Sequence, residues 1–184
     1  METEKYAPPP CGEVEKAKLF RVGAKPGASV APTRNAFRVS TSPQGGGAVV
    51  EIARAWIGTP YVHQASVKGT GCDCLGLLRG VWREMGREEP ETVPNYSPDW
   101  AEATRAETLY MALKRHLREI DRAALAPGDV VLFRMAARGP AKHCGIVAEK
   151  GGALTLIHAR QNKRVSEEVF SPFWKKKLAY AFRL

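Results

Sequence analysis

GTGCDCLGLLRGVWREMG, residues 69–86, combines a glycine-rich loop with one face of an amphipathic helix. The apolar side chains of this helix recur every three or four residues: Cys74, Leu77, Leu78, Val81, Trp82 and Met85. Asp73 stands at the N-cap position, and Gly86 is suited to end the helix. We therefore predict a helix that begins directly after Asp73 and carries Cys74 in its first turn.

Other helices are expected on both sides of this one, and strands follow them. Residues 49–57 have helical spacing and stop at Gly58-Thr59-Pro60, whereas Ser97-Pro98-Asp99 signals a helix that runs to about Glu119. Strands are expected at 130–133, 143–149, 153–159 and 178–184, with Gly151-Gly152 as a hairpin turn. Helices followed by antiparallel strands predict an α+β fold, with the helices packed on the sheet.

Cys74 is the first candidate for chemistry. A thiol is a useful nucleophile only as the thiolate, and the first turn of a helix favours negative charge. The glycines before Cys74 leave room for a substrate backbone. A buried core cysteine is the alternative interpretation, because Cys74 shares the apolar face of its helix.

Two histidines on the predicted hairpin favour the nucleophile. A cysteine hydrolase needs an imidazole near the thiol and a third group that orients the imidazole. If the turn is Gly151-Gly152, residues that face each other across the hairpin sum to 303, and a turn at 150–151 gives 301. Either even-length turn places His143 and His158 on the same face of the hairpin.

A zinc site is the main competing hypothesis. Its ligands would be Cys72, Cys74, His143 and Cys144. Their spacing does not match the usual zinc pairs, and adjacent strand residues point to opposite faces. We therefore expect no metal and no cofactor. Several other side chains are interpreted as core or incidental: Cys72, Cys144, Trp56, Trp82 and Trp174 as core, His63 and His116 as incidental.

Composition narrows the class of protein. The chain has 184 residues, a net charge of +9 and four cysteines, too few for a disulfide scaffold at this length. The basic residues are scattered and no nucleic-acid motif is present, so a specific nucleic-acid partner is not expected. No apolar run approaches the roughly 20 residues of a membrane helix, and Met1-Glu2-Thr3-Glu4 does not begin like a signal peptide.

Residues 1–47 differ from the rest of the chain. They hold six prolines and six glycines and show no apolar periodicity. Such a segment buries too little surface to offset its ordering entropy. We predict a flexible or partner-docking arm that ends in a Gly45-Gly46-Gly47 linker, with the folded domain at 48–184. A tail without a role is the alternative.

Five short motifs in order resemble the NlpC-type family of papain-like cell-wall cysteine peptidases. They are Gly58-Thr59-Pro60-Tyr61, Cys72-Asp73-Cys74-Leu75-Gly76-Leu77, Pro127-Gly128-Asp129-Val130-Val131-Leu132-Phe133, Lys142-His143-Cys144-Gly145-Ile146 and Ile157-His158-Ala159. The resemblance covers about residues 48–184 and is strongest to members encoded in phage-tail and gene-transfer-agent clusters. It implies a cysteine-bearing helix packed on an antiparallel sheet that carries the histidine.

The resemblance also implies roles for residues. By motif position, Cys74 matches the nucleophile, His143 the base and His158 the orienting residue. Tyr61 and Asp73 match positions that help to bind substrate. Leu75 replaces the family's usual serine, which removes a hydroxyl expected on the substrate side.

The implied function is hydrolysis of peptidoglycan stem peptides, commonly between D-γ-glutamyl and diaminopimelate residues. His63-Gln64-Ala65 replaces the family's common Trp-Gly-Gly, as expected of the phage-tail branch. That branch implies a tail-tip or baseplate protein, assembled in the bacterial cytoplasm and acting in the periplasm or cell wall, with tail proteins as partners of residues 1–47. Two alternatives stay open: a structural tail protein with a vestigial peptidase fold, and another thiol amidase or acyltransferase.

Overall fold

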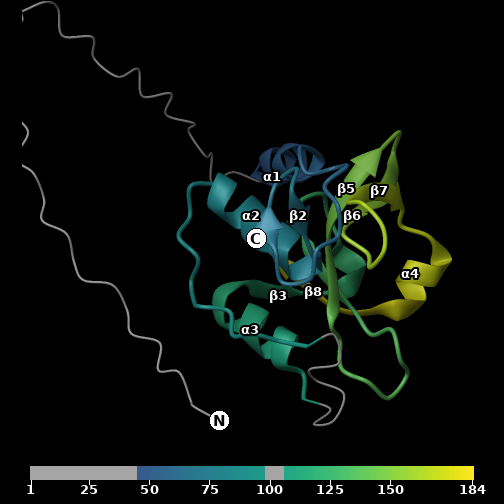
Figure 1. Cartoon of the computed structure of the whole chain (residues 1–184). Helices are drawn as coiled ribbons and strands as arrows, with labels where there is room; N and C mark the ends of the chain where they lie inside the picture. Colours follow the sequence, from purple (N-terminus) through teal and green to yellow (C-terminus); the bar gives the residue numbers. More distant parts are fainter. Residues whose placement is uncertain (1–44, 98–105) are drawn as a thin grey trace, which may run out of the picture. The chain divides into compact units, whose positions relative to one another are not determined.

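The computed structural model of the chain describes residues 45–97 and 106–184 (Figure 1). Its helices are α1 (Gly45–Arg54), α2 (Cys74–Glu84), α3 (Thr108–His116), the short 3₁₀ helix η1 (Arg122–Ala124) and α4 (Pro172–Lys177). Its strands are β1 (Ser66–Val67), β2 (Gly71–Cys72), β3 (Arg118–Ile120), β4 (Val130–Phe133), β5 (His143–Lys150), β6 (Ala153–His158), β7 (Ser166–Val169) and β8 (Leu178–Arg183). Within the described residues, no helix is long and apolar enough to cross a membrane.

The main sheet has six strands in the order β3-β8-β4-β5-β6-β7, and every neighbouring pair is antiparallel. The expected α+β fold is therefore confirmed. The β5–β6 hairpin turns at Gly151-Gly152, since Lys150 pairs with Ala153 and Ile146 with Ile157. Both turn glycines have positive φ, 61° and 77°, as a two-residue hairpin turn requires.

Successive side chains of each strand point to opposite faces of the sheet, and side chains on both faces are buried. On one face, α1 and α2 cover Ile146 and Ile157 with Val49, Trp56 and Leu77. On the other face, Phe170 and Trp174 cover a second cluster formed by Val131, Phe133, Val147 and Leu156. His143 and His158 have the parity of this second face. Cys74 comes from the helix-covered face, so Cys74 and the two histidines meet where β5 begins.

Three element boundaries differ from the sequence predictions. Gly45, Gly46 and Gly47 form the start of α1 instead of a linker, and a Cβ on Gly46 would lie 2.1 Å from the Pro127 carbonyl oxygen. The α-helix also stops at Arg54, before the predicted end at residue 57. Trp56 N and Ile57 N donate to carbonyls three residues back, which tightens the chain into turns.

The third helix ends earlier than predicted. Its last helical residue is His116, and Glu119 lies in β3, where it pairs with Phe182 of β8. Sheet pairing therefore overrides the helical periodicity at this point. The predicted helix start at Pro98-Asp99 lies outside the described residues. The strand β7 and the helix α4 were not predicted at all, nor were the short elements β1, β2, β3 and η1.

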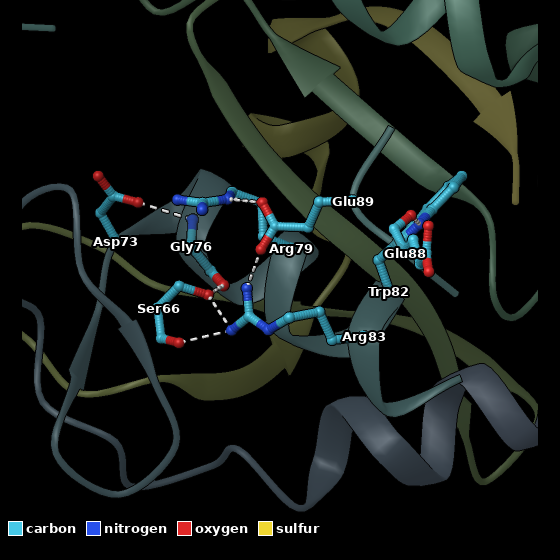
Figure 2. A network of polar contacts seen from close by, with 8 residues as sticks. All are labelled: Ser66, Asp73, Gly76, Arg79, Trp82, Arg83, Glu88 and Glu89. Carbon is cyan, nitrogen blue, oxygen red and sulfur yellow. Dashed lines mark hydrogen bonds and ion pairs between the residues drawn. The ribbon is translucent and has the colours of Figure 1, made fainter. Parts of the chain in front are cut away.

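A polar network fixes the outer face of α2 to the loops around it (Figure 2). Ser66 Oγ donates to the Gly76 carbonyl at 2.6 Å, and Arg83 Nη2 donates to the Ser66 carbonyl at 2.6 Å. Glu89 receives hydrogen bonds from both Arg79 and Arg83. The network holds the first turn of α2, and with it Cys74, against the β1–β2 loop.

Candidate active site

Cys74 is the first residue of α2, as predicted, and is half-buried. Asp73 caps the helix, since its Oδ1 accepts from Gly76 N at 2.7 Å. The pKa of Cys74 lies well below its ordinary value. A hydrogen bond from the Cys144 thiol is the largest cause, and a hydrogen bond and the charge of His143 lower it further against the effect of burial. The lowered pKa and the position in the first turn of the capped helix α2 together favour a thiolate at Cys74.

Cys144 does more than fill the core. It is fully buried, as predicted, but its thiol also faces Cys74. The hydrogen bond to Cys74 and burial raise the pKa of Cys144 well above its ordinary value. Cys144 therefore keeps its proton and donates it toward the Cys74 sulfur. The sequence places Cys144 directly after His143, but no sequence pattern indicates that its thiol contacts Cys74.

The two histidines meet as the hairpin parity predicts. His143 Nε2 and His158 Nδ1 lie 2.9 Å apart, which is hydrogen-bond distance. The other ring nitrogen of His143, Nδ1, is left for the Cys74 side. Gly145 makes this arrangement possible, because a Cβ there would lie 3.1 Å from the His158 Cβ and 2.7 Å from Leu156.

Aromatic rings surround the histidine pair. Phe133 stacks on His143 at 5.8 Å between centroids, and Trp174 lies 5.6 Å from His143 and 4.9 Å from His158. His158 is fully buried, and burial, together with the charges of His143 and Arg160, lowers its pKa to about 3. His158 is therefore neutral near pH 7. Trp174, interpreted as a core residue from sequence, is also a wall of the site.

Asp73 and Tyr61 both line the cavity in front of Cys74. The Asp73 carboxylate is buried and already accepts from Gly76 N, from Gln64 N at 2.8 Å and from the Tyr96 hydroxyl at 2.5 Å. In the structure these hydrogen bonds hold the loop before β1. A direct contact between Asp73 and the substrate stays a prediction. Burial, with the charges of Cys74 and Asp73, raises the pKa of Tyr61 to about 12, so its hydroxyl stays a donor.

His63 is a cavity residue, contrary to the prediction that it is incidental. Its Nε2 lies 2.8 Å from the Tyr96 carbonyl oxygen, and its Nδ1 lies 3.7 Å from Asp73 Oδ2. Its position two residues after Tyr61, just before the glycine-rich loop, was the available signal. His116 lies away from this cavity, beside Glu91 at 3.6 Å.

The cavity has a volume of about 310 Å³ and combines polar and apolar walls. Cys74, His143 and Tyr61 lie along it together with Lys142 and Arg160. Among its described lining residues, Asp73 is the only carboxylate, and that group is buried. The open part of the cavity is therefore suited to a substrate that carries carboxylates.

Comparison with known proteins supports the same interpretation. Residues 58–183 match the model of the NlpC/P60 family. The chain belongs to the NlpC/P60 family. The recognised resemblance to NlpC-type peptidases is thereby confirmed at the level of the family.

Two curated relatives share this NlpC/P60 region. The gamma-DL-glutamyl hydrolase of Bacillus subtilis is 30% identical over 131 residues, which are 71% of this chain and 27% of that protein. The murein DD-endopeptidase MepH of Escherichia coli is 27% identical over 132 residues, which are 70% of this chain and 42% of that protein. The chain thus spans less than half the length of each.

Solved NlpC/P60 structures share the fold. The NlpC/p60 domain of the peptidoglycan hydrolase SagA matches with a TM-score of 0.52 and 24% identity, over 76% of this chain and 98% of that chain. An NlpC/P60 protein from Bacillus cereus matches with a TM-score of 0.53 and 20% identity, over 75% and 39% of the two chains. These likenesses support the papain-like α+β architecture.

Leu75, the departure from the family motif, lies away from the catalytic cavity. It lines a separate apolar cavity of about 330 Å³ with Leu78 and Trp82 of α2 and Leu109 and Leu113 of α3. It also packs on the core cluster around Cys144. Leu75 is not among the described residues that line the cavity in front of Cys74, and its effect on the substrate side stays a prediction.

Proposed function

We propose that the chain is a cysteine hydrolase of peptidoglycan stem peptides, with Cys74 as nucleophile, His143 as base and His158 as the residue that orients His143. The observation that carries the proposal is the arrangement of these three side chains. A thiol of lowered pKa faces one nitrogen of His143, and the other nitrogen lies 2.9 Å from His158. This is the geometry of an activated nucleophile with an oriented base.

The reaction follows in two steps. The Cys74 thiolate attacks the amide carbonyl, and the backbone N–H of Cys74 stabilises the oxyanion. His143, protonated by the thiol, gives its proton to the leaving amine, which departs and leaves a thioester. His143 then takes a proton from water, the hydroxide attacks the thioester, and the thiol is restored with release of a carboxylate.

The substrate class rests on the relatives and on the cavity. The two curated relatives are named for gamma-DL-glutamyl and murein peptide bonds. Lys142 and Arg160 line the cavity and suit the carboxylates of stem peptides. Because the two names imply different bonds, we propose the substrate class and leave the bond to the product masses.

Mass spectrometry of stem peptides tests the proposal. Purified stem peptides are incubated with the wild-type protein, with Cys74→Ala and with Cys72→Ala. Cys72 is buried and burial raises its pKa to about 12, so it serves as a matched control. We expect cleavage by wild type and Cys72→Ala only. Equal cleavage by Cys74→Ala would remove Cys74 from the mechanism.

The proposal extends to the setting of the enzyme. The His63-Gln64-Ala65 sequence favours a phage-like tail-tip or baseplate protein that acts on the cell wall, with residues 1–44, the part of the predicted arm that precedes α1, as the docking arm. The test compares particles from cells that produce the full chain with those that produce a chain lacking residues 1–44. We expect only the full chain to copurify with particles. Equal copurification of both would reject the docking arm.

A second outcome of the same chemistry is acyl transfer. The thioester at Cys74 can be opened by an amine as well as by water. Adding a free stem peptide as acceptor to the assay distinguishes the two, because transfer gives a joined product of higher mass. A protein that neither cleaves nor joins peptides, with or without residues 1–44, would fit the structural tail protein instead.

A further inference from the structure

Glu168 of β7 extends the row of side chains behind Cys74. Its Oε1 lies 2.9 Å from His158 Nε2 and accepts from Trp174 Nε1 at 2.8 Å. Its Oε2 lies 3.5 Å from Arg160 Nη2. The register of β6 and β7 brings it there, since Leu156 pairs with Glu168 and His158 with Ser166. No sequence motif assigns a role to this residue.

The contact between Glu168 and His158 is close but poorly directed. The two atoms are 2.9 Å apart, yet the contact does not meet hydrogen-bond geometry, and among the described residues His158 Nε2 has no other hydrogen-bond partner. His158 is neutral, because its pKa is lowered to about 3. A neutral imidazole carries one proton, on Nδ1 or on Nε2. A carboxylate beside Nε2 favours the proton on that nitrogen.

The position of this proton decides what His143 can do. With the proton on Nε2, His158 Nδ1 is an acceptor for the His143 Nε2–H at 2.9 Å. His143 Nδ1 is then free to receive the Cys74 proton, and the imidazolium that results keeps a partner for both N–H groups. With the proton on His158 Nδ1, two donors would face each other whenever His143 is charged, which disfavours the thiolate–imidazolium pair.

We propose that Glu168 is a positioning residue that holds the His158 proton on Nε2 and so keeps His143 ready to accept the proton of Cys74. The inference rests on the proposed roles of Cys74 and His143. Trp174 supports it from the other side, since its indole N–H fixes the Glu168 carboxylate in place.

Other titratable or charged groups face this row of side chains and stay unchanged in the test. They are Tyr61, His63, Asp73, Tyr96, Lys142, Cys144 and Arg160. Because none of them is altered, a change in the behaviour of Cys74 or His158 reports on Glu168.

The experiment uses the full chain with Glu168→Gln and Glu168→Met. Glutamine keeps an acceptor oxygen without the charge, and methionine removes both. Glu167→Gln is the matched control, because Glu167 lies next in the strand but binds Arg54 at 2.9 Å and Thr155 at 2.7 Å. Nitrogen NMR of labelled histidines gives the His158 tautomer, and iodoacetamide alkylation across pH gives the reactivity of Cys74.

We expect the His158 proton on Nε2 in wild type and Glu167→Gln, and a shift toward Nδ1 in Glu168→Met. Alkylation of Cys74 near neutral pH should fall roughly tenfold or more in Glu168→Met and by less in Glu168→Gln. Wild-type tautomer and alkylation profile in Glu168→Met would overturn the inference. If that variant does not fold, Glu168→Gln decides alone, and an unchanged profile overturns it.

Both readouts are independent of peptidoglycan. If wild type cleaves no stem peptide but shows the expected tautomer and alkylation order, the proposed function is rejected and the role of Glu168 stands. If wild type cleaves stem peptides through Cys74 but Glu168→Met behaves as wild type, the proposed function stands and the role of Glu168 is rejected.

Discussion

The chemistry of Cys74 depends on single neighbouring atoms. The Cys144 thiol is the largest cause of the lowered pKa of Cys74, ahead of His143. A neutral thiol donor thus contributes part of the pKa lowering that is usually attributed to the imidazole. Since thiolate hydrogen bonds act at short range, this contribution should be separable by substitution.

Cys144→Ala should raise the pKa of Cys74. Without the thiol donor, the thiolate loses a hydrogen bond, so the alkylation midpoint moves upward by roughly one pH unit. Ultraviolet thiolate absorbance and alkylation across pH measure the shift. Cys72→Ala is the control, since Cys72 is also a fully buried cysteine. An unmoved midpoint in Cys144→Ala would show that the Cys144 thiol does not lower the pKa of Cys74, and would leave His143 and the backbone N–H of Cys144 as the causes.

Gly145→Ala should impair activity more than stability. The new methyl group would meet Leu156 at 2.7 Å and His158 Cβ at 3.1 Å, and His158 must shift away from His143. We expect a fall in stem-peptide cleavage of about a hundredfold with a stability loss of about 1–3 kcal/mol. Cleavage rates and urea unfolding measure the two effects. Full activity would show that the hairpin absorbs the methyl group without moving His158.

At the scale of elements, local signals predicted the helix α2 that carries Cys74 and the β5–β6 hairpin. The Asp73 cap, the apolar face of α2 and the Gly151-Gly152 turn are encoded within a few residues, so their positions follow from sequence. The parity of the two histidines follows from the same turn. The position of Cys74, the histidine pair and the fold class were therefore within reach of sequence reasoning.

The parts that were missed depend on distant partners. Strand β7, with the sequence Ser-Glu-Glu-Val, has no apolar alternation and forms because β6 offers it an edge. Glu168 therefore gave no sign that it lies beside His158. Helix α4 did carry a local signal, Ser171-Pro172 at its start. Recognising this helix start would have predicted that Trp174 lies at the site and not only in the core.

The ion pair between Arg54 of α1 and Glu167 of β7 should tie these two elements together. Arg54 donates from Nε and Nη2 to the two Glu167 oxygens at 3.0 and 2.9 Å, and to the Glu149 carbonyl at 2.8 Å. Both side chains are partly shielded from solvent. We expect Arg54→Met to cost about 1–2 kcal/mol of unfolding free energy. A double-mutant cycle with Glu167→Gln measures the coupling between them.

This ion pair also predicts a pH dependence. The Arg54 hydrogen bond lowers the pKa of Glu167 below its ordinary 4.5. The stabilisation is therefore complete above about pH 4.5 and is lost as the pH falls through the lower folded-state pKa. The stability gap between wild type and Glu167→Gln should narrow on acidification below that point. A gap that stays constant down to pH 3 would contradict the pairing.

For the whole molecule, the main question is which part of the chain folds as a unit. The predicted boundary at residue 48 would cut through the first turn of α1, which begins at Gly45. Val49, Val50 and Ala53 of this helix are buried against α2 and the sheet. The helix is therefore part of the domain that presents Cys74, not a connection to it.

Truncation at two points tests this boundary. A chain of residues 45–184 keeps all of α1 and should retain the full chain's melting temperature to within a few degrees. A chain of residues 55–184 loses the burial of Val49, Val50 and Ala53, on the order of 5 kcal/mol. Because domains are stable by only about 5–15 kcal/mol, this chain should be largely unfolded or melt far lower. Circular dichroism melts compare the three chains. If residues 55–184 had the same melting temperature as the full chain, α1 and the ion pair of Arg54 would contribute nothing to the stability of the fold.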